Sequence, residues 1–124
     1  MDNHREIASF AQERMRVSVV DHEQQVIISW RGVFDALNPH QTLGEFLWKQ
    51  HEALRHKDVL IDFSKMEFLN SATLSVMLRF VKELDAIIQK LTLKFNTAES
   101  WQMVSFRCMK AISRTLKHTE VLTH

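Results

Sequence analysis

A strand pattern, a helix pattern and a second strand pattern follow one another between residues 59 and 95, and this succession constrains the fold most. Val59-Leu60-Ile61 is a short apolar run ending in polar residues, which is typical of a buried strand. Asn70-Ser71 then opens a run of helical periodicity that continues to about Gln89. Residues 91–95 alternate again as a strand. Strands joined by a helix lie parallel with a right-handed crossover, so an α/β fold is predicted.

The remaining segments extend this unit at both ends. Residues 1–13 are polar with scattered apolar positions and are predicted to be a flexible tail. Residues 17–30 contain two β-branched runs around a short polar connection, which predicts an antiparallel hairpin. Further helices are predicted from Asn38-Pro39 to about His56 and over 97–115, with a short strand near 120–122. Residues 14–124 are therefore expected to form one domain: a four- to five-stranded mixed sheet with an N-terminal β-hairpin and three main helices on one face.

Composition and charge favour an intracellular protein without a polyanionic partner. The 16 basic and 15 acidic residues leave a formal charge of +1, which gives no support to binding of nucleic acid or an anionic membrane. The charged N-terminus does not resemble a signal peptide, and no apolar run is long enough to span a bilayer. Cys108 is the single cysteine, so no internal disulfide can form. We expect a cytoplasmic protein.

Motifs for metal, cofactor or enzyme chemistry are weak. The seven histidines form no HExxH motif, and His51 and His56 lie on different faces of a helix. Asp62 ends a strand as a phosphoaspartate would, but Asp21 and Glu23 fall in the predicted hairpin rather than in a Mg²⁺-binding cluster. No GxSxG elbow or Gly-rich phosphate loop is present. We therefore expect no metal, no cofactor and no enzymatic activity; a module that binds a small apolar ligand is a further alternative.

Ser71 is the candidate functional residue because it is predicted at the first turn of a helix. Free N–H groups and the positive end of the helix dipole favour an anion there. A phosphate on Ser71 would add about −1.5 to −2 charges. The fold would tolerate this charge, whereas an apolar interface with a partner would not. The other interpretation is that Asn70 or Ser71 is only a helix cap.

The helix that follows Ser71 has an unusually wide apolar face. Leu74, Met77 and other residues form an ordinary core stripe, and Val76 and Phe80 lie beside it. Two interpretations stay open: Val76 and Phe80 pack under a neighbouring helix, or they line a groove for a partner next to Ser71.

The segment resembles the STAS domain (sulfate transporter and anti-sigma factor antagonist). The resemblance rests on Ile61-Asp62-Phe63-Ser64, then Phe68-Leu69, then Asn70-Ser71-Ala72-Thr73, and the order of strands and helices fits from about residue 15 to about 116. The closest likeness is to small bacterial regulatory phosphoproteins of partner-switching systems. By position Ser71 matches the phosphorylated serine, Asn70 replaces the usual aspartate, and Thr73 replaces the usual glycine and is the alternative phosphorylation site.

The resemblance implies an anti-sigma factor antagonist-like protein whose binding to a partner is controlled by phosphorylation. An anti-sigma-type serine kinase would add the phosphate and a PP2C-like phosphatase would remove it. The target would be the kinase itself, freeing a sigma factor, or an output enzyme such as a diguanylate cyclase. The alternative is a non-switching scaffold or oligomerisation module, and the chain is expected to be a monomer or weak dimer. The predicted partner-binding residues are Asn70, Ser71, Ala72, Thr73, Val76, Phe80, Ser64 and Lys65.

Overall fold

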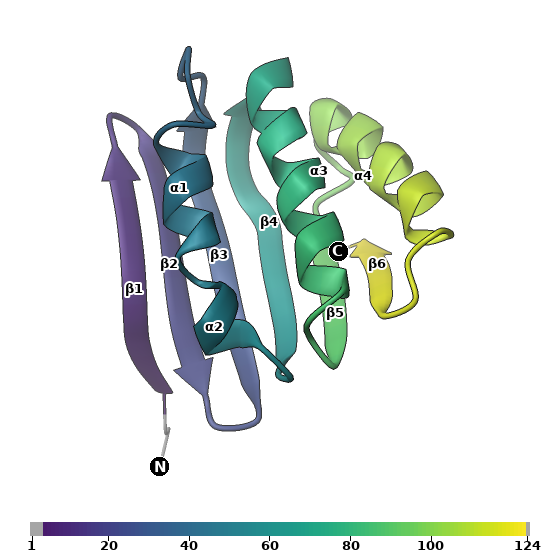
Figure 1. The fold of residues 1–124 in the computed structure, drawn as a ribbon. Coiled ribbons are helices and arrows are strands. Elements are labelled where there is room, and N and C mark those ends of the chain that lie inside the picture. Colours follow the sequence, from purple (N-terminus) through teal and green to yellow (C-terminus); the bar gives the residue numbers. More distant parts are fainter. Residues whose placement is uncertain (1–3, 124) are drawn as a thin grey trace.

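Six strands form one mixed sheet in chain order in the computed structural model, which describes residues 4–123. The first three strands are antiparallel, and the last four run parallel to one another. Figure 1 shows this sheet with its helices. The elements are β1 (His4–Gln12), β2 (Met15–His22), β3 (Gln25–Phe34), α1 (Leu43–Trp48), α2 (His51–Leu54), β4 (Asp58–Leu69), α3 (Ser71–Asp85), β5 (Lys90–Phe95), α4 (Ser100–Ser113) and β6 (Thr119–Thr123).

The strand order explains why the helices lie along one face of the sheet. From β3 to β6 each parallel strand is placed beside the preceding one, always in the same direction across the sheet. Right-handed crossovers in one direction bring every connecting helix to the same side. In Figure 1 the helices accordingly lie on the side of the sheet that faces the viewer.

Alternate residues of the central strands build the core under these helices. In β4, Val59, Ile61 and Phe63 are buried, while the residues between them are only partly buried. The ring of Phe63 lies 5.1 Å from that of Trp30 in β3 and 5.0 Å from that of Phe95 in β5. This aromatic row joins the three central strands.

The predicted flexible tail is wrong for residues 4–12, which form the edge strand β1; residues 1–3 lie outside the described part of the chain. The strand pairs with β2 through a two-residue turn, and its register shifts around Ile7. That shift interrupts the alternation that would have marked a strand. The turn is Glu13-Arg14, with Glu13 at φ 52°, and lacks the glycine or asparagine that usually announces a hairpin. The sheet consequently has six strands instead of four or five.

The predicted hairpin is confirmed as β2 and β3, whereas the connection to β4 differs from the prediction. One helix was predicted from residue 38 to residue 56, but α1 begins at Leu43 and a break at residues 49–50 separates it from α2. Among residues 4–123 the helices therefore number four. In addition, β4 extends to Leu69, so Ser64 and Lys65 lie within this strand.

Gln102 and Asp85 are buried polar residues that tie the C-terminal third to the sheet. The Gln102 side chain donates to the carbonyls of Ser64 and Met66, at 3.3 and 3.0 Å, and accepts from the backbone of Asn96 at 2.7 Å. The Asp85 carboxylate accepts three hydrogen bonds from residues 117–119, at the start of β6. Because their polar atoms have partners, both side chains can be buried without a large desolvation cost.

Candidate functional site

Asn70 fixes the start of α3 against the end of β3. Its Oδ1 accepts the backbone N–H of Thr73 at 2.9 Å, which is a helix N-cap. Its Nδ2 donates to the Ala36 carbonyl at 3.0 Å, and its backbone N–H donates to the Phe34 carbonyl at 2.9 Å. Parallel strands end at the same edge of a sheet, so this asparagine can hold the chain after β3 and the first turn of α3 together.

Ser71 is the first residue of α3, and it is exposed. Within residues 4–123 its hydroxyl makes no hydrogen bond to another group of the chain. The predicted placement of this serine at a helix start is confirmed. The hydroxyl is therefore accessible to a modifying enzyme without any change in the fold.

The backbone at the start of α3 can accommodate an anion. Thr73 N–H is taken by the Asn70 side chain and Leu74 N–H by the Asn70 carbonyl, at 3.1 Å. The N–H groups of Ser71 and Ala72 precede the hydrogen bonds of the helix. The first turn contains no acidic residue. A negative group on Ser71 would be stabilised here by about 0.3 to 2 kcal/mol.

Thr73, the predicted alternative phosphorylation site, is in the interior. Its side chain is 0% exposed, and its Oγ1 donates to the Phe34 carbonyl at 3.3 Å. A phosphate at Oγ1 would break this bond and bury a charge. The assignment of Thr73 as a modified or partner-binding residue is therefore corrected.

Val76 and Phe80 are also buried, which corrects their assignment to a partner groove beside Ser71. Their exposed fractions are 3% and 4%. Helices α1 and α2 cover this side of α3: an added Cβ at Gly44 in α1 would meet Val76 Cγ1 at 4.0 Å, and the ring of His51 in α2 lies 6.1 Å from that of Phe80. The apolar face of α3 is wide because Val76 and Phe80 pack against the neighbouring helices.

Ser64 and Lys65 lie within β4. The hydroxyl and backbone N–H of Ser64 both donate to Asp62 Oδ1, at 2.6 and 2.9 Å. Lys65 is exposed and opposes Arg31 where the register of β3 and β4 shifts. The Ser64 carbonyl also accepts from the Gln102 side chain of α4 at 3.3 Å. Partner binding by Ser64 and Lys65 stays a prediction.

Two exposed apolar residues in the segments that Asn70 joins were missed by sequence reasoning. Leu37 is 92% exposed and Phe68 is 47% exposed. Leu37 follows Ala36, whose carbonyl holds the Asn70 side chain, and Phe68 precedes Asn70 by two residues. The sequence did contain a signal that Leu37 is exposed. It stands in a polar stretch without a strand or helix pattern, so no regular element directs its side chain into the core. We call Leu37, Phe68 and Ser71 the Ser71 surface.

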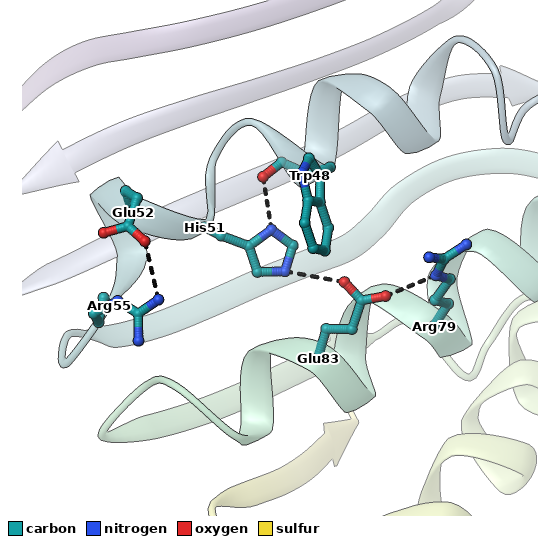
Figure 2. Close-up of polar contacts among 6 residues, drawn as sticks. All are labelled: Trp48, His51, Glu52, Arg55, Arg79 and Glu83. Atoms are coloured by element: carbon teal, nitrogen blue, oxygen red, sulfur yellow. Dashed lines mark hydrogen bonds and ion pairs between the residues drawn. The ribbon is translucent and has the colours of Figure 1, made fainter.

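A second polar cluster links α2 to α3, as Figure 2 shows. His51 Nδ1 lies 2.7 Å from the Trp48 carbonyl, which can only accept, so this nitrogen carries a hydrogen. Its Nε2 lies 3.2 Å from Glu83 Oε2, within ion-pair distance but without hydrogen-bond geometry. Arg79 Nε donates to the other Glu83 oxygen at 2.7 Å. Glu83 thus accepts a hydrogen bond from Arg79 and lies beside the His51 ring.

Glu52 and Arg55 form a separate exposed pair on α2 (Figure 2). The Arg55 guanidinium donates to Glu52 Oε1 at 3.0 Å, and this bond lowers the pKa of Glu52 below its usual value. Because both side chains are exposed to solvent, the pair adds little to stability.

Asn70 should matter for stability in two separable ways. Asn70→Ala removes the cap and the donor to Ala36, so we expect the free energy of unfolding to fall by about 2 kcal/mol. Asn70→Asp keeps the acceptor for Thr73 but replaces the donor to Ala36 by a carboxylate oxygen, so we expect a smaller loss, of about 1 kcal/mol. Urea denaturation of both variants measures the difference. Equal losses would contradict the role given to the Ala36 contact.

The described residues hold no group of three or more His, Cys, Asp or Glu side chains placed to bind a metal ion. Within residues 4–123 no helix is both long and apolar enough to cross a membrane. No protein-family model matches this chain, and no curated protein sequence matches it significantly.

Proposed function

We propose that this chain is a STAS-like regulatory protein of the partner-switching type, in which phosphorylation of Ser71 controls binding to a protein partner. The observation that carries the proposal is the exposed Ser71 hydroxyl at a helix start, with no hydrogen bond among the described residues. Leu37 and Phe68 are exposed apolar residues in the two segments that Asn70 joins. The resemblance of residues 61–73 to the STAS signature supports the same residue.

The switch works because a phosphate on Ser71 would be tolerated by the folded protein but not by the interface with a partner. On the free protein, a phosphate of about −1.5 to −2 charges would lie near the positive end of α3, where it costs the fold nothing. In a complex, the same phosphate would be pressed among Leu37, Phe68 and the apolar surface of the partner. Burial of a charge without a partner is strongly unfavourable. Phosphorylation therefore releases the partner without unfolding the protein.

The two departures from the STAS signature have structural reasons in this chain. Asn70 donates to the Ala36 carbonyl, which an ionised aspartate could not do. Thr73 donates to the Phe34 carbonyl, which a glycine could not do. Both replacements tie the loop to the end of β3, so they support the local geometry around Ser71.

The proposed cycle needs three further proteins. An anti-sigma-type serine kinase adds the phosphate, and a PP2C-like phosphatase removes it. The unphosphorylated form binds the target, which is the kinase itself or an output enzyme such as a diguanylate cyclase. The protein acts through binding and performs no catalysis itself.

Intact-mass measurement after incubation with ATP and an anti-sigma-type kinase from the same genome tests the site. We expect the wild type to gain the mass of one phosphate and Ser71→Ala to gain none. Ser75→Ala is the matched control, because Ser75 is exposed one turn further along α3. Phosphorylation of Ser71→Ala to the wild-type level would contradict the proposal, as would loss of the phosphate in Ser75→Ala alone.

A further inference from the structure

A pocket of about 410 Å³ opens between α1 and α3. Its apolar lining consists of Leu47, Val76 and Phe80, which are at most 4% exposed, and of Trp48, which is 61% exposed. Pockets that bind small molecules in proteins measure about 300 to 1,000 Å³ and combine an apolar lining with a few polar groups. Ser71 does not line this pocket. It is therefore a candidate ligand site separate from the Ser71 surface.

The aromatic residues of the pocket suit a planar ring. Trp48 is 61% exposed, although it is among the largest apolar side chains of the protein. Its ring lies 4.6 Å from that of His51, at an angle of 56°. Phe80 meets the same histidine ring edge-on. A planar aromatic ligand could stack on Trp48 and remove its exposed face from water.

The charged groups at the rim favour a ligand that accepts hydrogen bonds. The Glu83 carboxylate accepts a hydrogen bond from Arg79 and lies 3.2 Å from His51 Nε2. The terminal guanidinium nitrogens of Arg79 and the ammonium of Lys49 have no acceptor among residues 4–123, although both residues line the pocket. Glu45 is the one lining acid without a partner in this part of the chain. Unused donors thus outnumber unused acceptors, and a carboxylate would satisfy them.

We propose that the pocket between α1 and α3 binds a small planar aromatic carboxylate, with its ring against Trp48 and its acid group toward Lys49 and Arg79. Ligand binding here is independent of phosphorylation at Ser71. The bound ligand would hold α1 and α3 together, so the domain would respond to a small molecule as well as to phosphorylation.

Three probes with one ring and different charges test the proposal: 2-naphthylacetate, 2-naphthylethanol and 2-naphthylethylamine. The readout is the indole N–H signal of each tryptophan in two-dimensional NMR spectra of the full chain. We expect saturable shifts of the Trp48 signal, with Trp30 and Trp101 unaffected. The acid should bind at least about tenfold more tightly than the amine, which corresponds to about 1.4 kcal/mol.

Variants separate the ring contact from the charge contact. Trp48→Ala should weaken binding of the acid at least about tenfold. Because this variant lacks the Trp48 indole, its binding is measured from the backbone NMR signals of α1. Val104→Ala is the control, because Val104 is an exposed apolar residue on α4; it should leave affinity unchanged. Lys49→Gln combined with Arg79→Gln and Glu83→Gln should bring the acid to the affinity of the alcohol.

Equal affinity for acid and amine would overturn the proposal, as would shifts spread over all three tryptophans. If no probe binds but Trp48→Ala weakens a protein complex, the pocket belongs to a protein interface and the proposal is wrong. Ser71→Ala should bind the acid with wild-type affinity. The ligand site would therefore remain valid even if the proposed phosphorylation switch were wrong.

Discussion

Replacement of Ser71 by aspartate is expected to weaken partner binding by at least about 30-fold and to leave the melting temperature nearly unchanged. A charge buried at an interface without a partner costs about 2 to 5 kcal/mol, and each 1.4 kcal/mol is tenfold in affinity. On the free protein the same carboxylate lies at the start of α3, where a negative charge is favourable by about 0.3 to 1 kcal/mol. Isothermal titration calorimetry and thermal unfolding measure the two effects.

Two control variants distinguish charge at the Ser71 surface from other causes. Ser71→Asn has nearly the same size as the aspartate variant but no charge, so it should lose much less affinity. Ser75→Asp carries the same charge four residues further along α3, outside the first turn. Loss of affinity in Ser71→Asn equal to that in Ser71→Asp would show a steric effect. An equal loss in Ser75→Asp would show a general effect of net charge.

Gly32→Ala is expected to lower the free energy of unfolding by about 3 kcal/mol or more. Gly32 has φ +92°, a conformation that costs other residues about 1 to 2 kcal/mol. An added Cβ would also lie 2.0 Å from the backbone oxygen of Arg14. That oxygen accepts a hydrogen bond from Val33 at 3.3 Å, so relief of the clash would separate the β1–β2 turn from β3. Urea denaturation measures the loss.

Gly44→Ala is the matched control for this substitution. Gly44 lies in α1, and an added Cβ would make ordinary contacts, at 3.5 Å to the Pro39 carbonyl and 4.0 Å to Val76. Alanine favours a helix over glycine by about 1 kcal/mol, so stability should be unchanged or slightly raised. If Gly32→Ala and Gly44→Ala had the same stability within about 1 kcal/mol, the structural role given to Gly32 would be wrong.

Local patterns predicted those elements whose hydrophobic period is regular. The β2–β3 hairpin, the strand beginning near Val59, the start of α3 and the strands β5 and β6 all follow from alternation or helical spacing. The edge strand β1 does not, because its register shift and its glycine-free turn remove the usual signals. The break between α1 and α2 also has no local breaker in the sequence: residues 49–50 are Lys-Gln.

The candidate site was predictable only in part, because burial depends on which element covers a face. Capping chemistry placed Asn70 and Ser71 correctly at the start of α3. The same helix period could not tell whether Val76 and Phe80 meet solvent or another helix, since the position of α1 is set by tertiary packing. The sequence also did not reveal that Thr73 points inward to the Phe34 carbonyl. Leu37 carried a signal as an apolar residue in a polar stretch, whereas the exposure of Phe68 became visible only in the structure.

The most direct measurement compares the affinity of one protein sample for its partner before phosphorylation by the kinase, after it, and after treatment with the phosphatase. Phosphate on Ser71 should weaken binding by at least about 30-fold, and its removal should restore the original affinity. Equal affinity of the phosphorylated and unphosphorylated forms, with Ser71 fully modified, would contradict the proposed switch.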